Sequence, residues 1–343
     1  MKRIMNHMVR IGCLAVFWAM MAGSQEASGA ATPEEFYRGQ TLKWIVIDDP
    51  GSGPDLIGRI IVPFLAREIG AKVKIENRKS EEGVNYLYNQ GARDGLTLGA
   101  KSRDAMIANE ILKAPGVRYE TDKFNFVADV SPALKMFQIS PKVPYKTLDA
   151  LRKAKGLRAG ATSAKGSLAI CGAVMAEILG LDANVITGFK GRKALTLAIA
   201  RGEVDFMVPT DNSAMRDEKD GYVVNLFAVG QKRSAGAPQA PALSELGVAI
   251  PKEMAAAHKF ISASGTAMIL PPGVPAERVE YLRKVFQTLS NNEELQKGLE
   301  KLTGARKAFV SGQELQEEMA EIKADKELAN KLDAIFKKYT AVR

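Results

Sequence analysis

Apolar residues along the chain follow two alternating patterns, short β-branched runs and longer amphipathic stretches. Residues 42–47 form an apolar run, residues 48–55 are rich in turn formers, and residues 56–69 place apolar side chains on one helical face. The same order of strand, loop and helix recurs at residues 158–179. Strands that alternate with helices predict parallel sheets with helices on both faces.

The C-terminal part of the chain follows a helical pattern alone. Ser311 and Glu314 have the spacing of a capping box, and the apolar residues after them recur at three- and four-residue steps. We interpret this stripe as a surface that faces the protein core rather than a membrane. Beyond residue 30, no apolar run reaches the roughly 18 residues that suggest a membrane-spanning helix.

The start of the chain has the three regions of a cleavable secretory leader. Lys2, Arg3 and Arg10 are basic, residues 11–23 are apolar, and Ser28-Gly29-Ala30 supplies the small residues that a signal peptidase reads. The apolar run is shorter than the roughly 20 residues that span a bilayer. We therefore predict a signal peptide over residues 1–30, cleavage after Ala30 and a periplasmic protein.

Cysteine content and charge narrow the classes of partner. Only Cys171 remains after cleavage, so no intramolecular disulfide can form, and we expect a buried free thiol. Removing three basic residues and one acidic residue with the leader lowers the formal net charge from +9 to +7. The charges are dispersed and no basic run alternates with aromatic residues, which argues against a nucleic-acid partner. The net positive charge suits an anionic solute or a negative membrane surface equally well.

The sequence offers little for catalysis. His258 is the only histidine after the leader, which excludes metal sites built on several histidines. No nucleophile elbow, HExxH motif, P-loop or dinucleotide-binding glycine motif is present. A dyad of Cys171 and His258 has no further support. We predict no catalytic residue, no metal and no cofactor.

Two loops have the composition of an anion-binding site. Gly51-Ser52-Gly53 joins a predicted strand to a predicted helix, and residues 163–167 do the same in the second block. Small residues let a ligand approach backbone N–H groups, and the start of a helix presents unpaired donors with partial positive charge. Many such loops are only tight turns. Two of them in successive blocks predict a small anion held across a cleft.

Short motifs spread over most of the chain indicate a family. In order, they are Pro50 to Asp55 with Arg59, Glu76-Asn77-Arg78, Asp94-Gly95, Gly166-Ser167, Phe189-Lys190-Gly191, Gly202 to Asp205, Asp211 to Ala214, and Pro272 to Pro275. Each motif is weak alone, but their order and spacing are specific. From about residue 36 onward the chain resembles the periplasmic substrate-binding proteins of tripartite tricarboxylate transporters, the Bug family.

The resemblance implies a type-II periplasmic-binding fold. Two α/β lobes would be joined by two crossing segments, with the C-terminal helices returning to the first lobe. The first lobe would comprise residues 31–137 and 262–343, and the second residues 138–261. The protein would be a monomeric receptor that docks on membrane transporter subunits without performing chemistry. The alternative is a ligand-sensing periplasmic subunit of a two-component signalling system.

The resemblance also implies a carboxylate-bearing organic ligand, held by backbone amides and hydroxyl groups. The matching positions are Gly51, Ser52, Gly53 and Ser102 in the first lobe, and Ser163, Gly166, Ser167, Lys190 and Asp211 in the second.

Asp48 departs from the family, which has an aromatic residue at this position. At roughly 6 Å and an effective dielectric constant near 20, it would repel an anionic ligand by about 2.8 kcal/mol. Asp48 could point away and cap a turn, or pair with a cation such as Arg103 or Lys190. We predict instead that it lies in the site and faces an ammonium or hydroxyl group of the ligand.

Overall fold

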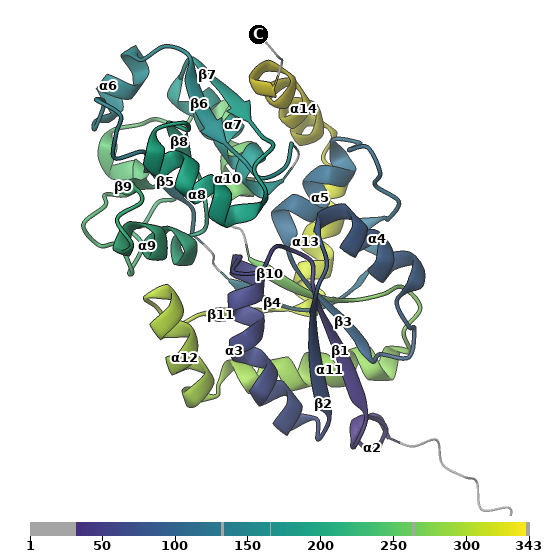
Figure 1. Cartoon of the computed structure of the whole chain (residues 1–343). Coiled ribbons are helices and arrows are strands. Elements are labelled where there is room, and N and C mark those ends of the chain that lie inside the picture. Colours follow the sequence, from purple (N-terminus) through teal and green to yellow (C-terminus); the bar gives the residue numbers. More distant parts are fainter. Residues whose placement is uncertain (1–31, 132–133, 165, 263–264, 341–343) are drawn as a thin grey trace, which may run out of the picture. The chain divides into compact units, whose positions relative to one another are not determined.

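The computed structural model describes residues 32–131, 134–164, 166–262 and 265–340. The predicted leader, residues 1–30, lies outside them. Helix α2 (Pro33–Tyr37) comes first, and residues from Tyr37 onward belong to one compact unit that holds two sheets (Figure 1). Among the described residues, no helix combines the length and apolarity needed to cross a membrane.

In the described part of the chain, six strands form the first sheet, in the order β11-β4-β10-β3-β1-β2. They are β1 (Thr41–Val46), β2 (Lys72–Asn77), β3 (Thr97–Ser102), β4 (Asn125–Ser131), β10 (Thr266–Leu270) and β11 (Ala308–Ser311). Strand β1 runs parallel to β2 and β3, with Val46 opposite both Asn77 and Ala100. This register brings the loop after β1 beside the end of β3, because parallel strands end at the same edge.

The second sheet has five strands within the described ranges, in the order β7-β6-β8-β5-β9. They are β5 (Met136–Ile139), β6 (Leu157–Gly160), β7 (Ala183–Ile186), β8 (Phe206–Met207) and β9 (Val224–Ala228). Strand β6 is parallel to β7 and β8, so the loops after all three lie at one edge. Phe137 stacks between Phe206 and Phe227, with centroid distances of 4.8 Å to each.

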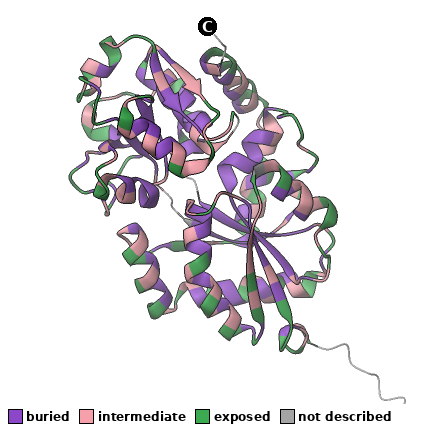
Figure 2. Ribbon diagram, viewed as in Figure 1, coloured by how far each residue is buried: buried purple, intermediate pink, exposed green. Residues whose placement is uncertain are grey.

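Helices cover both sheets. The helices α3 (Gly53–Glu68), α4 (Ser80–Gln90), α5 (Arg103–Ile111), α11 (Ala276–Ser290), α12 (Glu293–Thr303) and α13 (Gly312–Ala324) accompany the first sheet. The helices α6 (Leu148–Lys153), α7 (Ser167–Leu179), α8 (Gly191–Arg201), α9 (Asp211–Lys219) and α10 (Ala255–Ser262) follow strands of the second or pack on its helices. Short 3-10 turns are η1 (Thr121–Lys123), η2 (Leu243–Leu246) and η3 (Lys252–Met254). Buried residues concentrate on the strands and on the inner faces of the helices (Figure 2).

The apolar C-terminal stripe is buried, as predicted, but it serves both sheets. Helices α11 and α13 pack on the first sheet, and α12 packs on α3. The last helix, α14 (Lys326–Thr340), packs instead against α7 and β7 of the second sheet. Its end is fixed by Glu177 of α7, which pairs with Lys338 at 2.6 Å and accepts a hydrogen bond from the Tyr339 hydroxyl at 2.9 Å.

The chain passes from the first sheet to the second between β4 and β5, and returns between α10 and β10. Two sheets with two such connections are the architecture predicted from the resemblance. The lobe boundaries at 137/138 and 261/262 stay a prediction; strand β5 extends across the first of them.

Candidate ligand-binding cavity

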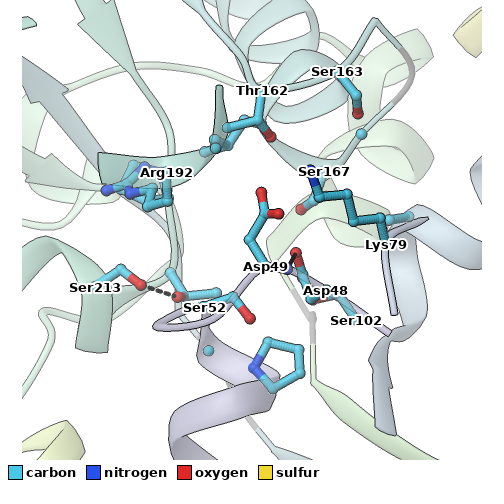
Figure 3. A pocket seen from close by; sticks show the side chains of 18 of the residues that line it. Asp48, Asp49, Ser52, Lys79, Ser102, Thr162, Ser163, Ser167, Arg192 and Ser213 are labelled. Carbon is cyan, nitrogen blue, oxygen red and sulfur yellow. Dashed lines mark hydrogen bonds between the residues drawn. The ribbon is translucent and has the colours of Figure 1, made fainter. Parts of the chain in front are cut away.

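A cavity of about 550 Å³ lies at the strand ends of both sheets (Figure 3). We call the loops after β1 and β3 its first-sheet side, and the loops after β6, β7 and β8 its second-sheet side. Lys135, between β4 and β5, also lines it. The volume falls within the roughly 300–1,000 Å³ of small-molecule sites.

Six of the helices that the structure describes begin at this cavity. The N-cap residues of α3, α4, α5, α7, α8 and α9 are Ser52, Lys79, Ser102, Gly166, Lys190 and Thr210, and all six line it. Each helix start presents N–H groups without an intrahelical acceptor and carries partial positive charge. Their convergence makes the cavity suited to an anion.

The helix starts differ in how their own side chains use these donors. In α3, the Ser52 hydroxyl accepts from the Asp55 N–H at 3.5 Å. In α9, Asp211 and Asn212 accept the N–H groups of Asn212 and Ser213 at 2.9 and 2.7 Å. Helices α7 and α8 have neither a side-chain cap nor an acidic residue in the first turn. No side chain at these two helix starts therefore accepts a hydrogen bond from the first-turn N–H groups.

A buried polar triangle lies beside the start of α7. Lys135 Nζ donates to Asp104 Oδ2 at 3.2 Å and to Ser167 Oγ at 3.0 Å, and the Ser167 hydroxyl donates to the same Asp104 oxygen at 2.6 Å. Burial opposes the charge on Lys135, but Asp104, Cys171 and Asp211 together outweigh it and raise the pKa of Lys135, with Asp104 contributing most. The ammonium therefore stays charged at the wall of the cavity.

Cys171 and His258 have separate local partners. Cys171 is a buried free thiol, as predicted, and burial raises its pKa to about 11. The thiol therefore stays protonated at neutral pH. His258 Nε2 lies 2.8 Å from the backbone oxygen of Val229. Within the described residues, no group of three or more His, Cys, Asp or Glu side chains could hold a metal ion.

Two carboxylates line the first-sheet side, Asp48 and Asp49. Asp48 Oδ1 accepts the N–H of Asp49 at 2.8 Å. Burial raises the pKa of Asp48, and Lys101 is the cation that opposes this shift most strongly. Asp48 is thus part of the cavity wall, and the cations that act on it are Lys101 and Arg192 rather than Arg103 or Lys190.

Comparison with known proteins assigns the family. The family model described as "Tripartite tricarboxylate transporter family receptor" matches residues 57–334. The chain belongs to this receptor family. The predicted periplasmic location and the prediction of a receptor rather than an enzyme agree with this membership.

A curated relative and several solved structures of other proteins match this receptor over most of its length. It is 23% identical over 283 residues to the UPF0065 protein in the tcbD-tcbE intergenic region of Pseudomonas sp. (strain P51), which covers 80% of this chain and 81% of the relative. MatC from Rhodopseudomonas palustris with bound malate is 18% identical with a TM-score of 0.71, and covers 87% of this chain and 99% of its own. Rpa4515 from R. palustris with adipate is 17% identical with a TM-score of 0.74, and covers 86% and 97%. These likenesses confirm the predicted fold.

Eight of the ten predicted site residues of the receptor line the cavity, and their contact with a ligand stays a prediction. They are Asp48, Ser52, Gly53, Ser102, Ser163, Gly166, Ser167 and Lys190.

Gly51 and Asp211 do not line it. Gly51 makes the turn behind the loop at a φ of 79°, and its carbonyl accepts from Arg216 at 3.1 Å. Asp211 is buried and faces Lys307 at 3.7 Å. The resemblance to the family implied that Asp211 contacts the ligand, but its side chain is turned toward the protein interior.

Several cavity residues of the receptor were missed by sequence reasoning. They include Asp49, Lys79, Lys101, Lys135 and Arg192. Asp49, Lys101 and Arg192 lie within two positions of predicted site residues, so adjacency to those helix starts could have indicated them. Lys135 lies between the two sheets, where the pattern of apolar residues carries no signal.

Proposed function

We propose that this receptor binds a small carboxylate-bearing organic solute in the cavity, as a monomer in the periplasm, and delivers it to the membrane subunits of a tripartite tricarboxylate-type transporter. The observation that carries this proposal is the convergence of helix starts on the cavity, with α7 and α8 uncapped. The presence of malate and adipate in the two related structures supports a carboxylate ligand.

The charges of the cavity wall also favour an organic acid. Among the described residues that line it, the cationic side chains are Lys79, Lys101, Lys135, Lys190 and Arg192, and the carboxylates are Asp48 and Asp49. Cations in the majority give a positive potential, which raises the local concentration of an anionic solute.

The arrangement also suits a receptor that closes around its ligand. The cavity draws its wall from both sheets, so a bound solute contacts both lobes at once. A ligand that binds the closed state better shifts the population toward it. The closed receptor could then be recognised by the transporter subunits, without any covalent step.

Native mass spectrometry of gently isolated periplasmic protein tests this function. We expect a bound organic acid, and N-terminal sequencing of the same sample should begin at Ala31. Adding the acid back to ligand-free protein should raise the melting temperature by mass action and reduce the radius of gyration in solution scattering. Conversion of the acid to a product would instead identify an enzyme, and unchanged dimensions at saturation would argue for a rigid pocket.

A further inference from the structure

The Asp49 carboxylate reaches from the first-sheet side to a helix of the second-sheet side. A Cβ atom built on Gly191, the first residue of α8, would lie 3.5 Å from Asp49 Oδ2 and 4.0 Å from Oδ1. Both residues line the cavity. Figure 3 shows the Asp49 side chain pointing away from its own loop into the middle of the cavity. A carboxylate of the protein therefore lies beside the start of α8.

The start of α8 is the kind of place where a ligand carboxylate would bind. It has no side-chain cap and no acidic residue in its first turn. The Gly191 N–H donates to the Phe189 oxygen at 2.8 Å, whereas the following first-turn N–H groups have no intrahelical acceptor. Arg192 adds a buried positive charge, which pairs with Asp217 and is also stabilised by Asp48.

Asp49 has no competing partner among the described side chains. None of them donates a hydrogen bond to its carboxylate or forms an ion pair with it, and its own N–H is used by Asp48. The favourable field beside this half-buried carboxylate is that of the α8 start.

The start of α7 differs, because the carboxylate that contacts it, Asp104, does not line the cavity and is paired with the Lys135 ammonium. It presents Gly166 and the Ser167 hydroxyl, with Lys135 Nζ 3.0 Å from that oxygen. Asp104 lies behind this group, buried against Lys135. The α7 start thus remains for a carboxylate that comes with the ligand.

From this geometry, and resting on the proposed function, we propose that Asp49 occupies one of two anion sites and so sets the ligand class. The ligand carries one carboxylate, which binds at α7. Its other end carries a hydroxyl or ammonium group, which faces Asp48 and Asp49. A second carboxylate near Asp49 would be repelled, lowering affinity roughly tenfold to a hundredfold at separations of about 6 Å.

Matched acids of equal length test the proposal by calorimetry. The pairs are adipate with 6-hydroxyhexanoate, and succinate with 4-hydroxybutanoate. The wild-type receptor should bind the hydroxy acid of a pair at least about tenfold more tightly. Asp49→Ala should shift this ratio at least tenfold toward the dicarboxylate. Asp149→Ala, which removes an exposed first-turn carboxylate of α6 outside the cavity, should behave as wild type.

A preference of the wild type for dicarboxylates, or an unchanged ratio in Asp49→Ala, would overturn the proposal. A ligand-free readout separates this failure from failure of the proposed function. In the ligand-free protein, the amide chemical shifts of Arg192 and Lys193 should respond to Asp49→Asn and stay unchanged in Asp149→Ala. If the response is present but none of the four acids binds, the proposed function fails while the Asp49 geometry holds. Without the response, the geometry is wrong.

Discussion

Two strand–loop–helix units face each other across the cavity, the one that follows β1 and the one that follows β6. In the first, Ser52 and Asp55 use the N–H groups of the α3 start, and Asp48 and Asp49 add negative charge. In the second, α7 begins without a cap or an acidic residue, and Lys135 lies beside it. The side chains at the helix start thus decide what a strand–loop–helix unit can bind. The unit after β6 suits an anion, whereas the unit after β1 suits a group that donates hydrogen bonds.

Among the substitutions that test this comparison, Lys135→Met should have the largest effect, because it removes the cation beside the α7 start. Asp104 would then stay buried without its ammonium partner at 3.2 Å. Breaking a buried ion pair typically costs about 3–5 kcal/mol. Urea denaturation should show a loss of this size in the free energy of unfolding. Adding Asp104→Asn to Lys135→Met should recover part of the lost stability. If Lys135→Met alone is as stable as wild type, the ion pair of Lys135 with Asp104 does not stabilise the fold.

Asp48→Asn should have an intermediate effect that depends on pH. Burial raises the pKa of Asp48, so as the pH falls its charge is lost at a higher pH than that of an exposed aspartate. Because the uncharged form no longer repels an anion, adipate should bind roughly tenfold more tightly at the lower pH. In Asp48→Asn this dependence should disappear, while 6-hydroxyhexanoate should lose about tenfold in affinity.

The same shift has a consequence for folding. A raised pKa in the folded state means that the protonated form of Asp48 suits the fold better than the ionised form. The free energy of unfolding therefore falls as the pH rises through the pKa that Asp48 has in the folded protein. Asp48→Asn should therefore be more stable than wild type at neutral pH and equal to it in acid. Equal stability at both would show that Asp48 is solvated.

The smallest effect should come from a matched pair of glycine substitutions. A Cβ on Gly53 would lie 3.5 Å from Thr210 Oγ1, an ordinary contact, whereas a Cβ on Gly166 would lie 2.5 Å from Ser163 Oγ. Gly166→Ala must turn the Ser163 hydroxyl aside. We expect it to weaken binding of 6-hydroxyhexanoate several-fold in calorimetry, with Gly53→Ala close to wild type. The reverse order would place the carboxylate on the first-sheet side.

Sequence patterns predicted the elements and the loops because these depend on neighbouring residues. The apolar run before Asp48 and the periodic stripe after Pro54 place a helix start at the Gly51-Ser52-Gly53 loop, and the structure has it at Gly53. The stripe of the last helix likewise predicts a buried face. It does not say which surface that face meets, and α14 packs on the second sheet.

The chemistry of the cavity depends on contacts between distant residues, which local patterns do not encode. Lys135, Asp104 and Ser167 come from three separate elements and meet only in the folded chain. The sequence drew attention to Asp48 because of its departure from the family. The adjacent Asp49 was not recognised as a departure from the family, and only the structure shows that its carboxylate reaches Gly191.

The central claim is that the carboxylate of the ligand binds at the start of α7. A crystal structure of the receptor with its tightest-binding acid tests it most directly. We predict carboxylate oxygens within about 3 Å of the first-turn N–H groups of α7, with the Asp49 carboxylate still at the start of α8. A ligand carboxylate on the loop after β1, or one that displaces Asp49 from α8, would contradict the account.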